Sequence, residues 1–227
     1  MPRAIIARAK VTAALLGAAA FVVLAQGPAR AQSDFPADQA AGTPAQTGRV
    51  PPALGQALLR DPGQMVAGNP AGSISIVEFF DYRCPFCRAM QPRLQRLMAA
   101  DPRIRLVLKE WPLLGAQSIY TARVAIATSW QGKYNEVHDA LLDLRGEMDE
   151  TQVKDAVAAV GVDMERLGRD MTTGGARIDA VLARNADEAK QLGLQGTPGF
   201  VVGSHVIPGS VSFNDLRDIV NASMTPH

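Results

Sequence analysis

Cysteine and histidine are scarce in this sequence, which has only two Cys and three His among 227 residues. Small secreted scaffolds held together by disulfides are dense in Cys, so that class of fold is excluded. The hydrophobic residues make up 47% of the chain, enough for a core that needs no covalent staples. A zinc site is disfavoured, because the two cysteines lack two further ligands and His138, His205 and His227 are not paired in the sequence.

A strong charge of either sign is also absent. The chain has 23 basic and 22 acidic residues, and 19 basic residues remain against 22 acidic ones when residues 1–31 are left out. A mildly acidic chain of this kind gives no reason to expect nucleic acid or an anionic membrane surface as a partner.

Residues 1–31 have the pattern of a signal peptide. Arg3, Arg8 and Lys10 precede the apolar run VTAALLGAAAFVVLA, which is shorter than the ~20 residues that span a bilayer. Ala29 and Ala31 then supply the A-x-A pattern of a cleavage site. We therefore expect export to a periplasm with cleavage near Ala31, and an uncleaved anchor is the alternative.

Residues 32–66 are predicted to precede the main domain. Residues 32–52 are rich in Ala, Gln, Pro and Gly, a composition typical of a flexible linker, and residues 53–60 have the spacing of a short helix. A segment for oligomerisation over 32–66 is the alternative. Residues 67–227 are expected to form one domain, with an all-helical block inserted at about residues 116–173.

Hydrophobic periodicity predicts an α/β fold. Residues 73–80 (SISIVEFF) read as a buried strand, and residues 103–112 (RIRLVLKEWP) alternate apolar and polar side chains. The helical stretch between them completes a β-α-β unit with parallel strands. After the helical block come a helix over 176–193, a hairpin over 197–209 and a final helix capped by Ser212. The order is therefore β-α-β, helices, then α-β-β-α.

Both cysteines lie in FFDYRCPFCRAMQP (79–92), where the first strand passes into its helix. The free N–H groups and positive dipole at a helix start favour an anion, so the Cys84 thiol should ionise easily. We expect Cys84 to be exposed for attack on a partner sulfur, and Cys87, one turn inside, to be shielded and to resolve the mixed disulfide. A structural disulfide and a Cu(I) site, which suits two thiolates, are the alternatives.

The segments VEFFDYRCPFC, KEWPLLG and GTPGFVVGSHVIPG resemble the DsbA family of thioredoxin-fold proteins, and more narrowly its exported DsbA-like and ScsC-like branch. The resemblance covers about residues 70–222 and implies a thioredoxin fold with inserted helices. It implies that Cys84 is the nucleophile, Cys87 the resolving thiol and Pro198 the cis-proline that lies against them. Thr197 would pair its backbone with an extended substrate segment.

The resemblance also implies a role for Glu78, since the family keeps a buried acid beneath the resolving cysteine, where it can exchange a proton with Cys87. The alternatives are that Glu78 reaches solvent or pairs with Lys109. One feature departs from the family's strong oxidant, which has Pro-His between its cysteines. Phe86 carries no charge to stabilise the thiolate, so we expect a milder oxidant. Pro85 and Phe86 are also expected to contact the substrate.

These features predict a periplasmic thiol–disulfide oxidoreductase without a bound cofactor, because the dithiol itself carries the electrons. Its expected partners are unfolded or misoxidised exported proteins and a membrane redox partner that recharges the dithiol, and a homo-oligomer stays open. Whether it forms, isomerises or reduces disulfides depends on that recharging partner. A Cu(I)-binding or copper-stress thiol protein and a reductase of protein disulfides are the alternative functions.

Overall fold

A mixed sheet of six strands, in the order β1-β6-β5-β3-β4-β2, lies at the centre of the described residues. The computed structural model describes residues 48–61, 63–146 and 148–223, all of them within one unit of the chain. The strands are β1 (Gly48–Arg49), β2 (Met65–Gly68), β3 (Ile74–Phe80), β4 (Ile104–Glu110), β5 (Gly199–Val202) and β6 (His205–Pro208). The helices are α1 (Pro52–Arg60), α2 (Pro85–Ala100), α3 (Ala116–Thr128), the 3-10 helix η1 (Ser129–Gln131), α4 (Tyr134–Asp143), α5 (Glu150–Ala159), α6 (Met164–Thr173), α7 (Gly175–Gln191) and α8 (Phe213–Ala222).

The strands β3 and β4 are parallel and are connected by α2, which is the predicted β-α-β unit. The other neighbouring strands are antiparallel, with β5 beside β3, β6 beside β5, β2 beside β4 and β1 beside β6. In the centre of the sheet Glu78 lies opposite Leu108 of β4 and Phe200 of β5. The helices from α3 to α7 are inserted between the two halves of this sheet, as the sequence predicts.

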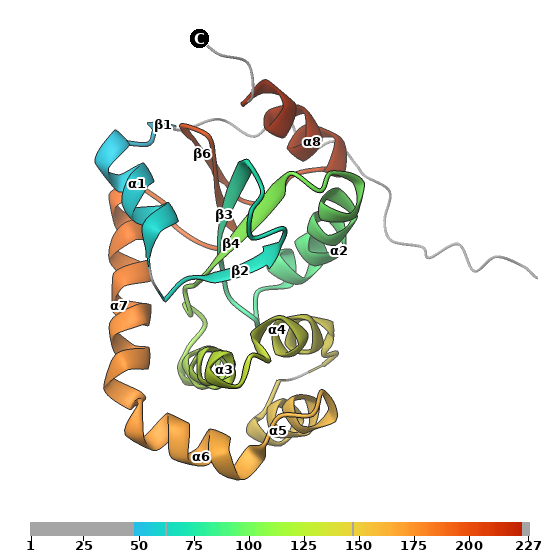
Figure 1. The fold of residues 1–227 in the computed structure, drawn as a ribbon, viewed down its shortest axis with the longest axis vertical. Helices are drawn as coiled ribbons and strands as arrows, with labels where there is room; N and C mark the ends of the chain where they lie inside the picture. Colours follow the sequence, from blue (N-terminus) through green and yellow to red (C-terminus); the bar gives the residue numbers. More distant parts are fainter. Residues whose placement is uncertain (1–47, 62, 147, 224–227) are drawn as a thin grey trace, which may run out of the picture. The chain divides into compact units, whose positions relative to one another are not determined.

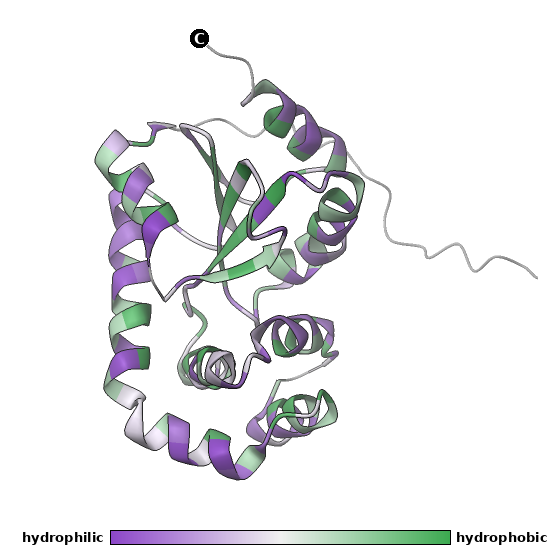
Figure 2. Cartoon of the chain, in the orientation of Figure 1, coloured by the Kyte–Doolittle hydropathy of each residue, from purple (hydrophilic) through white to green (hydrophobic). Residues whose placement is uncertain are grey.

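The two faces of the sheet bury separate sets of apolar side chains, because successive residues of a strand point to opposite sides. On β3, Ile76 and Phe80 pack in the core that includes α2, whereas Val77 and Phe79 pack with α1 and α7. Figure 1 shows α2 and α8 on one side of the sheet and α1 and α7 on the other. In Figure 2 the central strands are mostly green, for hydrophobic residues, and α7 carries many purple, hydrophilic ones.

The capping signals in the sequence lead to the expected local structures. Asp149 and Gln152 form a capping box at the start of α5, and Ser212 accepts a hydrogen bond from a backbone N–H at the start of α8. In the β5–β6 hairpin Gly203 has a φ of 58°, and no described residue other than glycine has a positive φ. Ser204 therefore keeps a negative φ, which gives the predicted type II′ turn.

The folded part of the chain begins before residue 67, the domain start predicted from the sequence. The strand β1 pairs with β6, α1 fully buries Leu58, and β2 extends the sheet beside β4. Strands this short carry too little periodicity to stand out in a linker-like composition. Residues 32–47 of the predicted linker or oligomerisation segment lie outside the described residues, as does the predicted signal peptide over 1–31.

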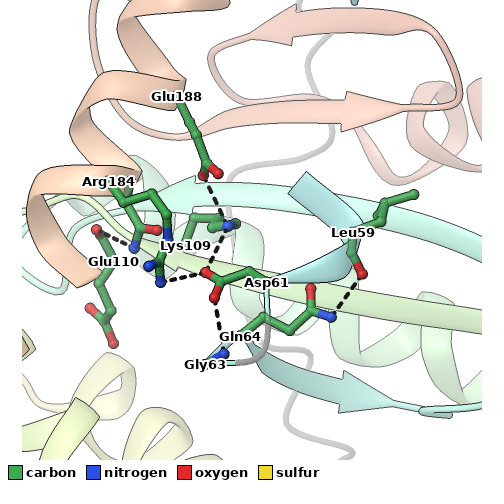
Figure 3. Close-up of polar contacts among 9 residues, drawn as sticks. Leu59, Asp61, Gly63, Gln64, Lys109, Glu110, Arg184 and Glu188 are labelled. Atoms are coloured by element: carbon green, nitrogen blue, oxygen red, sulfur yellow. Dashed lines mark hydrogen bonds and ion pairs between the residues drawn. The ribbon is translucent and has the colours of Figure 1, made fainter. Parts of the chain in front are cut away.

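A buried cluster of ion pairs connects the end of α1 to the sheet and to α7 (Figure 3). The Lys109 ammonium on β4 lies 2.9 Å from Glu188 Oε2 and 3.5 Å from Asp61 Oδ2, and Arg184 Nη2 lies 2.6 Å from the same Asp61 oxygen. Lys109 is only 1% exposed. Two cations and two anions therefore compensate one another where the end of α1 meets β4 and α7.

Among the described residues, no helix has both the length and the apolar character that crossing a bilayer requires.

Candidate active site

The C-x-x-C motif lies at the junction of β3 and α2. Cys84 is the N-cap residue of α2 and Pro85 is its first residue, the position that tolerates a missing N–H best. The backbone N–H of Cys84 donates to the carbonyl of Asp81 at 3.0 Å, and the Cys84 carbonyl accepts the N–H of Arg88 at 3.1 Å. The first turn of α2 therefore presents its free N–H groups to the Cys84 sulfur.

The structure corrects the expectation that Cys84 is exposed. Cys84 is 4% exposed and Cys87 is 1% exposed, and both are free thiols. The Cys84 thiol donates a hydrogen bond to the carbonyl oxygen of Thr197 at 3.2 Å, so the loop before β5 covers it. A residue at the start of a helix is usually exposed, which led to the expectation. The loop that covers Cys84 comes from a distant part of the chain, so the local sequence does not reveal it.

The thiol of Cys84 is nonetheless strongly acidic. A hydrogen bond from the Cys87 thiol lowers the pKa of Cys84 to about 6, and although burial opposes the shift, the Thr197 side chain and the backbone N–H groups of Cys87 and Phe86 add to it. At neutral pH Cys84 is therefore mostly a thiolate. The groups that lower this pKa most are uncharged hydrogen-bond donors, and Arg88 also interacts with the charge of Cys84.

The thiol of Cys87 is shifted in the opposite direction. Burial, the hydrogen bond with Cys84 and the charge of Glu78 raise the pKa of Cys87. The two sulfurs thus have separate protonation states at neutral pH, with the proton on Cys87 and the negative charge on Cys84.

Glu78 lies on the same face of β3 as Ile76 and Phe80, which pack against α2, and it is 2% exposed. Burial, together with the charge of Cys84, raises the pKa of Glu78 to about 8, so its carboxyl is protonated at neutral pH. The two alternatives for this residue are contradicted. Glu78 does not reach solvent, and Lys109 pairs with Asp61 and Glu188 on the opposite face of the sheet.

The predicted proline loop lies against the dithiol. The Thr197–Pro198 peptide bond is cis, as the resemblance implies, and the Pro198 carbonyl accepts the N–H of Gly209 at 2.8 Å. A groove of about 470 Å³ opens beside this loop. It is lined in part by Phe86, Gln195, Gly196, Thr197, Pro198 and Gly209.

The predicted substrate contacts Pro85 and Phe86 are both on the surface beside Cys84. Phe86 is 62% exposed, which is unusual for a large apolar side chain, and it forms one wall of this groove. The structure thus brings Cys84, Cys87, Phe86 and the Thr197–Pro198 loop together, with Glu78 buried on the same face of the sheet as α2.

Asp81 is a residue of the site that sequence reasoning missed. It is 1% exposed, and its Oδ1 accepts the N–H of Arg83 and the hydroxyl of Ser118, both at 2.8 Å. Its Oδ2 accepts the N–H groups of Leu113 and Leu114 at 2.7 and 3.0 Å. Asp81 therefore joins the turn before Cys84 to the loop after β4. Its position directly after a buried strand is the one signal that the sequence offers.

His138, which has no role predicted from the sequence, belongs to a buried polar cluster. The hydroxyls of Tyr82 and Tyr134 donate to Glu110 Oε1 at 2.9 and 2.8 Å, and the Tyr82 hydroxyl lies 3.2 Å from His138 Nδ1. Burial raises the pKa of Glu110 to about 8 and lowers that of His138 to about 3. The cluster is therefore uncharged at neutral pH.

His205, the other described histidine without a predicted role, is half-buried at the start of β6.

A dithiol at a helix start, a cis-proline loop against it and a β-α-β unit joined to a β-hairpin through inserted helices define a thioredoxin-like domain. The chain belongs to the family of DSBA-like thioredoxin domains, whose model matches residues 75–221. The resemblance to the DsbA family and the predicted fold class are thereby confirmed.

Solved structures agree with this assignment. A thioredoxin-like oxidoreductase from Silicibacter pomeroyi DSS-3 is 42% identical with a TM-score of 0.73, and the match covers 76% of this chain and 98% of that one. The thiol-disulfide exchange protein alpha-DsbA2 from Wolbachia pipientis is 25% identical with a TM-score of 0.70, over 75% and 92% of the two chains. The catalytic domain of Proteus mirabilis ScsC, at 24% identity, a TM-score of 0.68 and 75% and 94% coverage, shares the fold.

The curated sequence relatives include longer proteins of another kind. The Na(+)/H(+) antiporter NhaA 1 of Salinispora arenicola is 27% identical over 161 residues, which are 70% of this chain and 24% of that protein. The chain thus spans about a quarter of the length of the curated relatives that it matches first.

Proposed function

We propose that the chain is a thiol–disulfide oxidoreductase that forms or isomerises disulfides in exported proteins through Cys84 and Cys87. One observation carries the proposal: Cys84 caps α2 against the carbonyl of the cis Thr197–Pro198 loop, and this environment lowers the pKa of Cys84 and raises that of Cys87. A nucleophile must be ionised and its resolving partner must hold a proton until it reacts, and this pair has that distribution at neutral pH.

In the oxidising direction the chemistry begins from a Cys84–Cys87 disulfide. A substrate thiolate attacks the Cys84 sulfur, and Cys87 leaves as a thiolate that takes up a proton. A second substrate thiolate then attacks the substrate sulfur of this mixed disulfide and displaces Cys84, which leaves as a stabilised thiolate. The substrate gives up two electrons and gains a disulfide, the dithiol gains the two electrons, and the substrate protons pass to Cys87 and to solvent.

Isomerisation uses the same groups in the opposite order. The Cys84 thiolate attacks a wrong disulfide of the substrate, and the released substrate thiolate attacks another disulfide of the same protein. The thiolate set free by that attack then attacks the substrate sulfur of the mixed disulfide and displaces Cys84 as a thiolate. Cys87 frees Cys84 when the rearrangement stalls, because its attack on the mixed disulfide releases the substrate.

Glu78 is the proposed proton donor and acceptor for Cys87. Its carboxyl keeps a proton up to about pH 8, and its charge interacts with both sulfurs. A protonated Glu78 can supply the proton that Cys87 needs as it leaves the disulfide, and the carboxylate can take that proton back when Cys87 attacks.

Thr197, Pro198, Pro85 and Phe86 are the proposed substrate contacts. The backbone of Thr197 suits an extended segment of the substrate, and the exposed ring of Phe86 suits an apolar side chain in the adjoining groove. In its disulfide and thiolate forms Cys84 has no S–H to donate, so the Thr197 carbonyl is then free to accept an N–H of the substrate backbone.

The proposed location is the periplasm, reached through the signal peptide at residues 1–31 and followed by a linker or assembly segment. The proposed partners are unfolded or misoxidised exported proteins and a membrane protein that recharges the dithiol. Lowering the pKa of Cys84 stabilises the reduced form and makes the disulfide an oxidant. The uncharged donors around the sulfur favour a milder oxidant than the Pro-His relatives.

The direct test is the reaction of the oxidised protein with a peptide that carries two cysteines. The expected product is a peptide disulfide and a reduced protein, and Cys84→Ala, which cannot form the Cys84–Cys87 disulfide, should be inactive. With the disulfide form of the same peptide, reduced Cys87→Ala should accumulate a mixed disulfide at Cys84, because the resolving thiol is missing. Exchange that persists in Cys84→Ala would contradict the proposal. Equilibration of the dithiol with glutathione buffers then separates a disulfide donor, with a high reduction potential, from an isomerase or reductase with a lower one.

A further inference from the structure

An exposed apolar ledge lies beside the dithiol and has no role in the proposed function. Its side chains are Leu113, Leu114 and Ile119, which are 44%, 45% and 44% exposed. Its backbone is held in place, because the N–H groups of Leu113 and Leu114 both bind Asp81 Oδ2, three residues before Cys84. The ledge is thus a fixed neighbour of the turn that carries the reactive sulfur.

Three arginines border this ledge and the dithiol. Arg83 precedes Cys84, and its Nη1 donates to the Leu114 carbonyl at 2.8 Å, while Arg88 Nε donates to the Tyr82 carbonyl at 2.9 Å. Burial, followed by the positive charges of Arg145 and Arg83, lowers the pKa of Arg88, although the negative charges of Asp81 and Cys84 oppose the shift. Arg145 and Arg83 are therefore both close enough to repel the Arg88 guanidinium. Within the described part of the chain, none of the three has a carboxylate at ion-pair distance.

We propose that Arg83, Arg88 and Arg145, with Leu113, Leu114 and Ile119, form a docking surface for an acidic and apolar segment of the substrate protein close to its reacting cysteine. The proposal rests on the proposed function and adds the class of substrate segment that the site prefers.

Charge complementarity identifies the occupant. Guanidinium groups bind carboxylates with two parallel hydrogen bonds, and a carboxylate here would offset the repulsion that Arg88 experiences from Arg83 and Arg145. A basic segment would add to that repulsion. The ledge supplies apolar contact area, so the segment that gains most carries both acidic and apolar residues. Opposite charges on the protein and the substrate raise the rate at which the two meet, and salt screens this attraction. The preference for acidic segments should therefore appear in the association rate and weaken as the salt concentration rises.

The docking surface is separate from the groove at Phe86 and Pro198. That groove is formed by Phe86, the loop before β5 and the end of β6, whereas the docking surface comes from the β3–α2 turn with the first turns of α2, the β4–α3 loop with the start of α3, and the segment after α4. A substrate segment in the groove and a second one on the docking surface would approach Cys84 from different elements.

The test compares two synthetic peptides that share one cysteine and the same leucines, with Glu beside the cysteine in one and Lys in the other. The measurement is the second-order rate of mixed-disulfide formation with the oxidised protein, normalised by each peptide's rate with a small neutral disulfide. The acidic peptide should react about ten times faster at low salt, and the difference should shrink at high salt.

Variants locate the effect. Arg145→Glu should remove most of the preference for the acidic peptide, and Ile119→Ser should slow both peptides about threefold. The matched control is Arg103→Glu, the same charge change just before β4, at the opposite end of that strand from the ledge. It should leave both rates unchanged.

Equal normalised rates for the two peptides, or equal effects of Arg145→Glu and Arg103→Glu, would overturn the docking surface while the exchange reaction stands. No exchange with either peptide would instead overturn the proposed function and the docking surface together.

Discussion

The Cys84 thiol lies 3.2 Å from the carbonyl oxygen of Thr197, 113 residues further along the chain. The contact joins the start of α2 to the cis-proline loop, so the sulfur is buried by the tertiary fold although it caps a helix. Hydrogen bonds to the sulfur make the largest contribution to its acidity, and the two side-chain donors, Cys87 and Thr197, can each be removed by substitution.

The thiolate of Cys84 should titrate near pH 6 in the reduced protein, as measured by ultraviolet thiolate absorbance or by alkylation rates across pH. Because the Cys87 thiol is the largest contributor to this shift, Cys87→Ala should raise the midpoint by about one unit or more. A wild-type midpoint near the ordinary value of 9.0 would contradict the stabilised thiolate.

The side chain of Thr197 should add a smaller part of the same effect. Thr197→Val should raise the pKa of Cys84 by about half a unit and slow alkylation at pH 6, since the hydroxyl no longer donates to the thiolate. The matched control is Thr172→Val on α6, where the hydroxyl binds the Gly168 carbonyl on an exposed helix. Identical titration curves for Thr197→Val and wild type would rule out this donor.

Glu78 should make the reduced protein less stable as the pH rises. Its pKa in the folded state is about 8, above its ordinary value of 4.5, so the folded protein holds a proton that the unfolded chain has released over this range. Glu78→Gln should therefore lessen the loss of unfolding free energy between pH 5 and pH 8 by about 2–4 kcal/mol in urea titrations. Glu165→Gln, on the exposed side of α6, should leave the pH profile unchanged, and a Glu78→Gln profile parallel to wild type would contradict the raised pKa.

The charge cluster at Lys109 should be costly to break. Lys109→Met leaves the buried carboxylate of Glu188 without a cation and Asp61 with Arg184 alone, so unfolding free energy should fall by about 3–5 kcal/mol. Lys154→Met removes an exposed ion pair with Glu150 and should leave the unfolding free energy nearly unchanged. Equal losses in chemical denaturation of the two variants would show that the cluster does not fasten α1.

Much of the fold could be predicted because its signals are local. The strand at residues 74–80, the helix that starts after Cys84, the capping box at Asp149 and the Gly203-Ser204 turn all depend on neighbours within a few residues. The cis bond before Pro198 followed from the family resemblance. The edge strands β1 and β2 escaped prediction, because two and four residues are too few to show a period.

By itself, the sequence determined the order of strands and helices from β3 onward and placed the only two cysteines of the chain at the start of a helix, because periodicity, caps and turns are short-range effects. The tertiary structure decided that Cys84 is covered by Thr197, that Asp81 holds the loop after β4, and that Lys109 pairs with Asp61 and Glu188 and not with Glu78. Those contacts join segments far apart in the chain, and the face of the sheet to which each side chain points is set only when the strands pair.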